Sequence, residues 1–461
     1  MHFTRRLLDP HRSGLMVALA ALAALAASAA AVSCSSSDDP SKSPLSDAGV
    51  DGADTTDASD AAADSSGRDA GTFDGRPRPV VCESSPCAIA LVTTLGRSVE
   101  DKAEGFCVLL DDGTVACWGA NGAGQLGRGE GAGEALVDSS TAAKVVGLSN
   151  ITSLDHTCAV DTTGSVWCWG TGPFSWSEDG GGVTTTNTTP VKLDLPPVTK
   201  VARSFATACA VVGGDVQCWG SNAFGQLGQL SETSSGEPKR AALPNGVAAS
   251  ALEVGNATFV LREDGSVVSW GGNPGIGRVS PSFPDPLPQL VSLARVTQID
   301  SAYDNTCAVA NGIGYCWGAR VSPFKGTVID RALPEPVATP EPLVQIATTR
   351  SEGYLLHTDN KVRDFKPYRW CAVGDSGSVY CWGFNESGQA GTGTEEYVTR
   401  AAMVVGLPEK ALVAQVKTTV NTTCALLTNG KVYCWGSNYS GQLGNGLNRG
   451  KSLAPTEVVL P

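Results

Sequence analysis

The sequence predicts an all-β fold in which one hairpin is repeated around a β-propeller. Tryptophan followed by glycine recurs at Trp118, Trp169, Trp219, Trp270, Trp317, Trp382 and Trp435. Each tryptophan stands five residues after a glycine suited to a tight turn, and cysteines flank six of the seven copies. The copies are 47 to 65 residues apart. Repetition at this period, with glycine- and proline-rich connections and no amphipathic helical stretch, favours a propeller.

Each copy is typical of two antiparallel strands joined by a short turn. The flanking cysteines are nine residues apart around two-residue turns and ten apart around three-residue loops that end in glycine. Both spacings place the cysteines opposite each other, within disulfide range. The fourth copy has Phe259 and Ser269 at the two positions, so the cysteines are lost together, as bonded partners should be; free buried thiols are the alternative. The predicted hairpin disulfides are Cys107–Cys117, Cys158–Cys168, Cys209–Cys218, Cys307–Cys316, Cys371–Cys381 and Cys424–Cys434.

Residues 1–34 have the features of an export signal. A basic start is followed by an apolar, alanine-rich run over 15–32. The stretch Ala31-Val32-Ser33-Cys34 resembles the lipobox of bacterial lipoproteins, which implies that Cys34 is lipidated and becomes the mature N-terminus. By the same resemblance, Ser35 favours the outer membrane. An ordinary signal peptide cut nearby is the alternative.

Residues 35–80 are predicted to be a disordered, acidic tether. The segment is rich in Ser, Asp and Ala, and its ten aspartates against four basic residues give a net charge of −6. Such a composition cannot bury enough apolar surface to offset the loss of chain entropy. We expect it to join the lipid to a folded domain over 81–461.

Three features of this domain depart from simple repetition. Cys82 and Cys87 are expected to form a small loop disulfide, because no second cysteine pair completes a metal site. The longest gap between tryptophans contains a hairpin-like segment near 353–366, interpreted as an insertion before the sixth stapled hairpin. The C-terminal strand, within 455–460, is expected to complete the first blade and so close the ring.

The segment after four of the hairpins resembles the signature of the regulator of chromosome condensation repeat family. The resemblance implies a seven-bladed β-propeller over 81–461. The family's eukaryotic founder exchanges guanine nucleotide on a nuclear GTPase and docks on chromatin, but an exported, acidic, disulfide-bonded chain would meet neither partner. Other members bind proteins, so the resemblance implies protein binding without a small GTPase. The four matching segments are Asn121-Gly-Ala-Gly-Gln-Leu-Gly127, Asn222-Ala-Phe-Gly-Gln-Leu-Gly228, Asn385-Glu-Ser-Gly-Gln-Ala-Gly391 and Asn438-Tyr-Ser-Gly-Gln-Leu-Gly444.

Patterns that carry chemistry are weak in this chain. Gly374-Asp-Ser-Gly377 resembles the nucleophile motif of trypsin-like proteases, but Ser376 falls in a hairpin turn, and the mature chain has only His156 and His357 to serve a triad. A G-x-G-x-x-G match at 122–127 is one copy of the repeat and lacks a following helix. No cofactor or metal is predicted. The net charge of −13 disfavours nucleic acid.

We therefore expect a non-enzymatic lipoprotein of the cell envelope, on its periplasmic or outer surface, whose propeller binds or scaffolds other proteins and reaches the membrane only through its lipid. A glycan-binding module that uses loop aromatics is one alternative. A polysaccharide lyase or hydrolase is another, and it requires clustered acids with Arg, His or Tyr in the central funnel. Phe174 and Trp176 could instead cap the core of their own blade. The candidate binding aromatics are Phe174, Trp176, Tyr397 and Tyr439.

Overall fold

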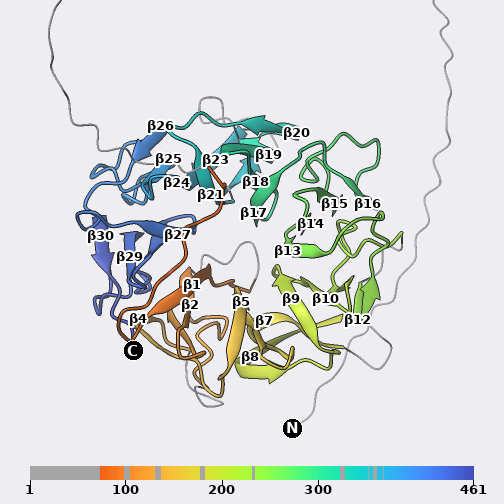
Figure 1. The fold of residues 1–461 in the computed structure, drawn as a ribbon, viewed down its shortest axis with the longest axis horizontal. Coiled ribbons are helices and arrows are strands. Elements are labelled where there is room, and N and C mark those ends of the chain that lie inside the picture. Colours follow the sequence, from red (N-terminus) through yellow and green to blue (C-terminus); the bar gives the residue numbers. More distant parts are fainter. Residues whose placement is uncertain are drawn as a thin grey trace, which may run out of the picture. The chain divides into compact units, whose positions relative to one another are not determined.

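Seven four-stranded antiparallel sheets surround a common centre in the computed structural model (Figure 1). The structure describes residues 73–97, 104–129, 136–176, 182–230, 234–321, 328–350, 352–356, 361–366 and 368–461. The predicted signal, Cys34 and His357 lie outside these ranges. Within them, every regular element is a strand, and no helix is long and apolar enough to cross a lipid bilayer.

The seven sheets are the blades of a propeller, numbered here in chain order, and each consists of strands that follow one another along the chain. Blades 1 to 3 comprise β1 (Ala88–Thr93), β2 (Gly105–Leu110), β3 (Val115–Gly119), β4 (Ser139–Lys144); β5 (Ile151–Asp155), β6 (Cys158–Asp161), β7 (Val166–Trp176), β8 (Gly182–Lys192); and β9 (Val198–Arg203), β10 (Thr207–Val212), β11 (Asp215–Gly220), β12 (Ser235–Arg240). Blades 4 and 5 comprise β13 (Ala249–Val254), β14 (Ala257–Arg262), β15 (Val267–Gly271), β16 (Asp285–Leu290); and β17 (Val296–Ala302), β18 (Asn305–Ala310), β19 (Ile313–Val321), β20 (Val328–Pro336). Blades 6 and 7 comprise β21 (Leu343–Thr348), β24 (Arg369–Gly374), β25 (Val379–Gly383), β26 (Val398–Met403); and β27 (Val413–Thr418), β28 (Thr422–Leu427), β29 (Val432–Ser437), β30 (Lys451–Glu457).

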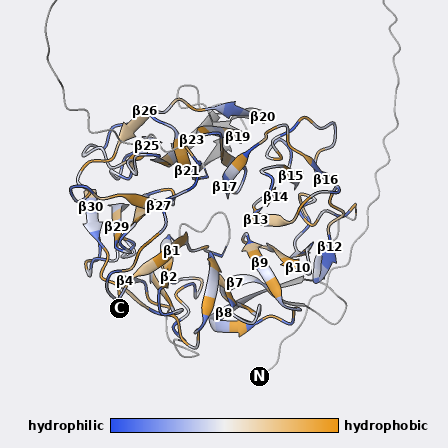
Figure 2. Ribbon diagram, in the orientation of Figure 1, coloured by the Kyte–Doolittle hydropathy of each residue, from blue (hydrophilic) through white to orange (hydrophobic). Residues whose placement is uncertain are grey.

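The segment inserted in blade 6 forms a separate two-stranded sheet. Strands β22 (Glu352–Leu356) and β23 (Lys361–Lys366) pair antiparallel between β21 and β24. The first strand of each blade lies nearest the centre and the fourth lies outermost (Figure 1). The outer strands β12 and β20 are hydrophilic, whereas the inner strands β1 and β27 are largely hydrophobic (Figure 2).

The predicted hairpins and their disulfides are confirmed. The middle two strands of six blades pair with the cysteines in register, at Cα–Cα distances of 4.0 to 4.1 Å. In the fourth blade, Phe259 and Ser269 are likewise directly opposed. Cys82 and Cys87 form the seventh disulfide, in a short loop before β1. The spacing of the cysteines in the sequence therefore predicts the register of the paired strands correctly.

The repeated tryptophans join neighbouring blades. Six of the seven are buried with an indole N–H that donates to a backbone carbonyl of the preceding blade, at 2.8 to 2.9 Å. Five of these carbonyls lie in the loop between the third and fourth strands, and the sixth, Pro173 O, lies within the third strand β7. The accepting carbonyls belong to Gln442, Gln125, Pro173, Gln226, Gly275 and Gln389. Trp382 instead stacks on Trp370. The segments of blades 2 and 4 that hold Pro173 and Gly275 depart from the repeat signature yet still supply the carbonyl.

The prediction that the C-terminal strand completes the first blade is wrong. Strand β30 is the outermost strand of blade 7, where it pairs with β29. Blade 1 already holds four strands from its own segment, because β1 precedes the first hairpin. No strand is shared across the junction of the first and last blades.

The ring is closed by an isolated antiparallel bridge between Thr141 and Asn445 and by side-chain contacts at several heights of the blade 1–blade 7 junction. Leu91 N–H donates to Gln415 Oε1 at 2.9 Å, beside the centre. The Glu104 carboxylate accepts from the backbone N–H and side-chain amide of Asn421 at 2.9 and 2.8 Å. Farther out, Trp118 packs in one buried apolar cluster with Leu443 and donates to Gln442 O.

An N-terminal strap, residues 73–87, also crosses the junction. It runs along the hairpin turns of blades 5 to 7 and then enters β1 (orange in Figure 1). A Cβ placed on Gly312, in the blade 5 turn, would lie 2.9 Å from the Phe73 ring. Arg78 donates to Asp375 O at 2.8 Å in the blade 6 turn, and Val81 N–H donates to Thr428 O at 2.7 Å in the blade 7 turn. Residues 73–80, predicted to belong to the tether, thus lie against the propeller.

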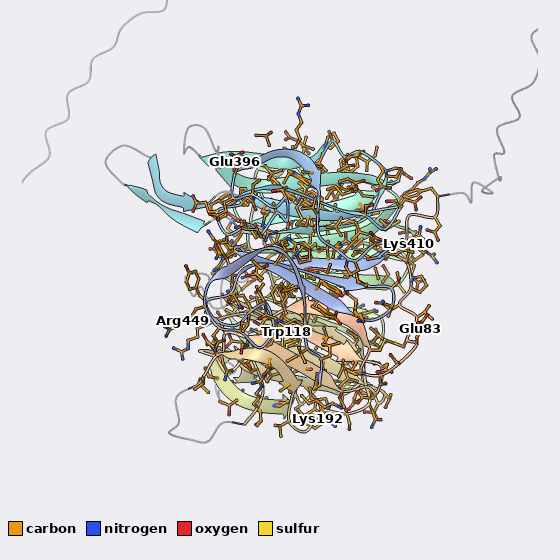
Figure 3. The ribbon with its side chains drawn as sticks, turned by 90° about the vertical axis from the view of Figure 1, so that its left-hand side faces the viewer. Glu83, Trp118, Lys192, Glu396, Lys410 and Arg449 are labelled. Atoms are coloured by element: carbon orange, nitrogen blue, oxygen red, sulfur yellow. A yellow bond between two sulfur atoms is a disulfide. The ribbon has the colours of Figure 1, made fainter. Side chains whose placement is uncertain are left out.

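The ring has two unlike faces. The strap lies on the turn face, defined by the hairpin turns around Asn311, Asp375 and Thr428. The opposite face, called the loop face, carries the connections from the first to the second strand and from the third to the fourth strand of each blade. In the side view, Lys410 and Glu83 lie on one side of the ring and Arg449 lies on the other (Figure 3).

Candidate functional site

A central cavity of about 360 Å³ lies where the innermost strands end, on the side of the loop face. The first strands of all seven blades contribute lining residues at their C-terminal ends, together with the turns that follow. The cavity therefore exists only because the ring is closed. This is the usual location of a ligand site in a concave, rigid scaffold.

Four ionisable residues form a charged cluster in this cavity: Asp155, Glu253, Asp300 and Lys417. All four occupy the same register position, since each pairs across the sheet with the first cysteine of its blade's hairpin or, for Glu253, with Phe259. The other three blades place small or apolar residues there: Val92, Ala202 and Ala347. The cluster is therefore one layer of the inner ring.

Lys417 is the cation of the cluster. Its Nζ lies 2.6 Å from Asp300 Oδ1, and the other Asp300 oxygen accepts the backbone N–H of Thr348 at 2.9 Å. Burial acts to lower the pKa of Lys417, but the Asp300 and Glu253 carboxylates outweigh it and hold that pKa above its ordinary value. Lys417 is therefore fully charged at neutral pH.

Glu253 is the acid of the cluster that favours its protonated form. Burial raises its pKa well above the ordinary value; Lys417 opposes this shift, and the negative charges of Asp300 and Asp155 add to it. Asp300, by contrast, is held in a salt bridge and a backbone hydrogen bond. Two carboxyl groups with different environments therefore face one cavity.

Arg203 closes the wall of the cavity at blade 3. Its guanidinium donates to Thr157 Oγ1 at 2.8 Å and to Thr171 O at 2.6 Å, and burial lowers its pKa to about 10 while Asp155 opposes that shift. The same guanidinium lies over the Phe174 ring, 5.0 Å from its centroid. Phe174 is only 7% exposed and belongs to an apolar cluster with Trp219. This burial favours the alternative in which the Phe174 ring caps a core, here the core between blades 2 and 3.

Three aromatic residues, called the aromatic group, also line the cavity: Phe205, Phe224 and Tyr303. Arg350 stands over the Phe205 ring at 5.7 Å, and Phe224 remains 39% exposed. Tyr303 has a φ of 62° and His156 a φ of 48°, in the left-handed region that non-glycine residues seldom occupy and that is enriched at functional sites. His156 Nδ1 lies 2.9 Å from Thr93 O.

The remaining residues predicted from sequence are dispersed. Tyr397 and Tyr439 are 40% and 74% exposed and lie outside the cavity lining. Trp176 ends β7, where its backbone pairs with Gly182; its side chain lies outside the described part of the structure. Ser376 lies in an exposed turn and donates to Glu341 Oε1 at 2.6 Å, as a turn serine would. Across the described ranges, no three His, Cys, Asp or Glu residues are placed to hold a metal ion.

The cavity does meet the requirement set by the polysaccharide-active alternative. Acids, arginines, a histidine and a tyrosine converge in the central funnel. Sequence reasoning missed all of these residues except His156. The four members of the charged cluster share a register position opposite the first hairpin cysteine or Phe259, but the unequal spacing along the chain conceals it.

Comparison with known proteins agrees with the fold. The family model described as "Regulator of chromosome condensation (RCC1) repeat" matches residues 153–174 and 413–442, and a second model of that description matches 429–461. RCC1 repeats are thus matched within blade 2 and across blade 7. Over 356 residues it is 27% identical to the ultraviolet-B receptor UVR8 of Arabidopsis thaliana, covering 74% of this chain and 76% of the receptor.

Two solved structures resemble this RCC1-repeat propeller in fold. Human WBSCR16 has a TM-score of 0.60 at 18% identity, covering 76% of this chain and 94% of that one. Yeast RCC1 (Prp20), solved with Kap60 bound, has a TM-score of 0.59 at 20% identity, covering 75% of this chain and 83% of that one. These two structures thus share the propeller fold of this chain.

Proposed function

We propose that this RCC1-repeat propeller is a non-enzymatic binding protein of the bacterial cell envelope, held by a lipid on Cys34, that presents its loop face to a protein partner. Yeast RCC1, of the same fold, has been solved with the protein Kap60 bound. The six buried hairpin disulfides suit an exported chain, because disulfides persist in oxidising compartments.

One observation carries the proposal: the N-terminal strap and the central cavity lie on opposite faces. The strap contacts the turns at Asp375 and Thr428, whereas the cavity is lined by the turns around His156 and Tyr303. A lipid on Cys34 would therefore be joined to the propeller through a strap on its turn face. The loop face, with its long connections on a rigid scaffold, is left for a partner.

Site-specific photocrosslinking on intact cells tests this proposal. A photoreactive amino acid at Tyr439, in an exposed loop-face connection, should capture a reproducible partner. The matched control is the same amino acid at Lys410, on the side of the ring that bears Glu83 (Figure 3). Equal capture from both positions, or none from Tyr439, would contradict protein binding through the loop face.

The anchor is tested separately. Cys34→Ala should abolish incorporation of radiolabelled fatty acid and move the protein from the membrane fraction to the soluble fraction. Membrane retention of that variant would rule out lipidation at Cys34 while leaving the binding role of the loop face open to the crosslinking test.

A further inference from the structure

We propose that the central cavity is a saccharide-binding pocket that takes a mono- or disaccharide, or the end of a longer glycan. This inference goes beyond protein binding and does not depend on it. It rests on four properties of the cavity: its size, its near balance of charge, its mixture of donors and acceptors, and its aromatic group.

The size fits a small ligand. A volume of about 360 Å³ falls at the lower end of the range of roughly 300–1,000 Å³ found for small-molecule pockets. Seven blades and six hairpin disulfides fix the wall, so the pocket is formed before any ligand arrives. A preformed pocket spares the ligand the cost of ordering the protein.

The charges in the lining nearly balance. Its described acids are Glu104, Asp155, Glu253 and Asp300, and its described bases are Arg97, Arg203, Arg350 and Lys417. These groups neutralise one another in part, as Lys417 and Asp300 do at 2.6 Å. When Glu253 is protonated, the described lining keeps one positive charge in excess. So small an excess gives no strong preference to a cation or an anion, and the lining suits a polar ligand that is neutral.

The cavity offers hydrogen-bond donors and acceptors side by side. Asp155 Oδ2 accepts the Arg203 backbone N–H at 3.0 Å, and no donor from the described residues reaches its Oδ1. Glu253 accepts from the backbone of Ser301 and otherwise faces the cavity with Lys417 nearby. A sugar hydroxyl both donates and accepts, so it can bond a carboxylate and an ammonium together. Such charge-assisted hydrogen bonds are about twice as strong as neutral ones.

The aromatic group supplies the apolar contact that a pyranose ring requires. One face of the sugar carries C–H bonds, which are attracted to the negative face of an aromatic ring. Phe205 and Phe224 come from two connections of blade 3, and Tyr303 comes from the turn after β17 in blade 5. Phe224 keeps 39% of its surface exposed, which makes its ring available to a ligand.

Two variants test the pocket without disturbing the fold. Phe224→Ala shortens a half-exposed side chain, and Tyr303→Asn removes the ring while keeping a residue that tolerates the left-handed backbone at φ 62°. Tyr439→Ala is the matched control, because it removes an exposed aromatic residue outside the cavity. All three should keep the thermal midpoint of the parent within a few degrees.

The experiment is a glycan array of mono- to tetrasaccharides, followed by calorimetric titration of the parent and the variants with the best-bound soluble sugar. We expect each cavity variant to bind about tenfold more weakly and Tyr439→Ala to bind as the parent does. No binding on the array, or binding that either cavity variant leaves unchanged, overturns the saccharide pocket. Photocrosslinking from position 439 in the Phe224→Ala variant separates this result from the fate of the protein-binding proposal.

Discussion

Lys417 Nζ lies 2.6 Å from Asp300 Oδ1, although the two residues belong to inner strands of the seventh and fifth blades. The ion pair therefore passes the inner strand of the sixth blade. Because the same ammonium also interacts with the Glu253 carboxylate of blade 4, one cation links three blades across the centre. The charged cluster therefore lines the cavity and also holds these three blades together.

Replacing Lys417 by methionine keeps the length of the side chain but removes this charge. The acids around it are then left without their cation, and we expect the free energy of unfolding at pH 8 to fall by about 3 kcal/mol. The loss of stability should be smaller at pH 5, because protonation of the neighbouring carboxylates relieves part of the repulsion between them. Denaturant unfolding at the two pH values checks this.

The control is Lys431→Met, since Lys431 pairs with Glu457 at 2.9 Å on the surface, with side chains 54% and 47% exposed. An exposed pair contributes at most about 1 kcal/mol, so this variant should lose much less stability. Equal losses in the free energy of unfolding for Lys417→Met and Lys431→Met would show that the central ion pair contributes no more stability than the exposed pair.

Glu253 and Glu457 should respond to pH with opposite signs. Burial raises the pKa of Glu253 in the folded protein, so the folded state binds this proton more tightly than the unfolded chain, and stability falls as pH rises above the ordinary value. Glu253→Gln removes this effect and should gain thermal stability relative to the parent between pH 4 and 8. Scanning calorimetry at both pH values measures it.

For Glu457, hydrogen bonds from Lys431 and then Tyr433 lower the pKa. Its contribution is present above the ordinary pKa and is lost as pH falls through the folded pKa. Glu457→Gln should therefore cost stability at pH 8 and little at low pH. If Glu253→Gln and Glu457→Gln both gain, or both lose, stability relative to the parent as the pH rises from 4 to 8, the environment assigned to Glu253 is incorrect.

Removal of the N-terminal strap should weaken the junction of blades 1 and 7. A chain that begins at residue 81 loses the Phe73 contact at Gly312 and the Arg78 hydrogen bond to Asp375 O. We expect a loss of about 1–2 kcal/mol in the free energy of unfolding. Hydrogen exchange should show faster opening of β1 and β27, while β13 in blade 4 stays protected; uniform protection would contradict a role in closure.

The hairpin disulfides can be tested in blade 7. Replacing Cys424 and Cys434 together by alanine opens a loop of ten residues and should lower stability by about 2–3 kcal/mol. Peptide mapping of the parent under non-reducing conditions should return the pairs within each hairpin. Bridges between hairpins would refute the register of the sheets.

Local patterns could be predicted from sequence because each rests on neighbouring residues. The turn glycine, the opposed cysteines and the tryptophan lie within one hairpin, so spacing alone identified the repeat. The position of β30 could not be predicted, because nothing within a four-strand repeat tells which strand comes first along the chain.

The charged cluster could not be predicted because its members meet only across the ring. Asp155 precedes its hairpin cysteine by three residues, and Asp300 and Lys417 precede theirs by seven. The connections vary in length, so equal register does not appear as equal spacing. Phe174 was open to two interpretations for a related reason, since the Arg203 guanidinium that covers it belongs to the next blade.

The contiguity of each blade bears on how the ring is assembled. Every hairpin disulfide joins cysteines nine or ten residues apart, so oxidation can follow each hairpin as soon as it emerges, without waiting for a distant thiol. Blades can then mature one after another in the order of synthesis. Only the last step, in which Gln415 meets Leu91, must await the complete chain.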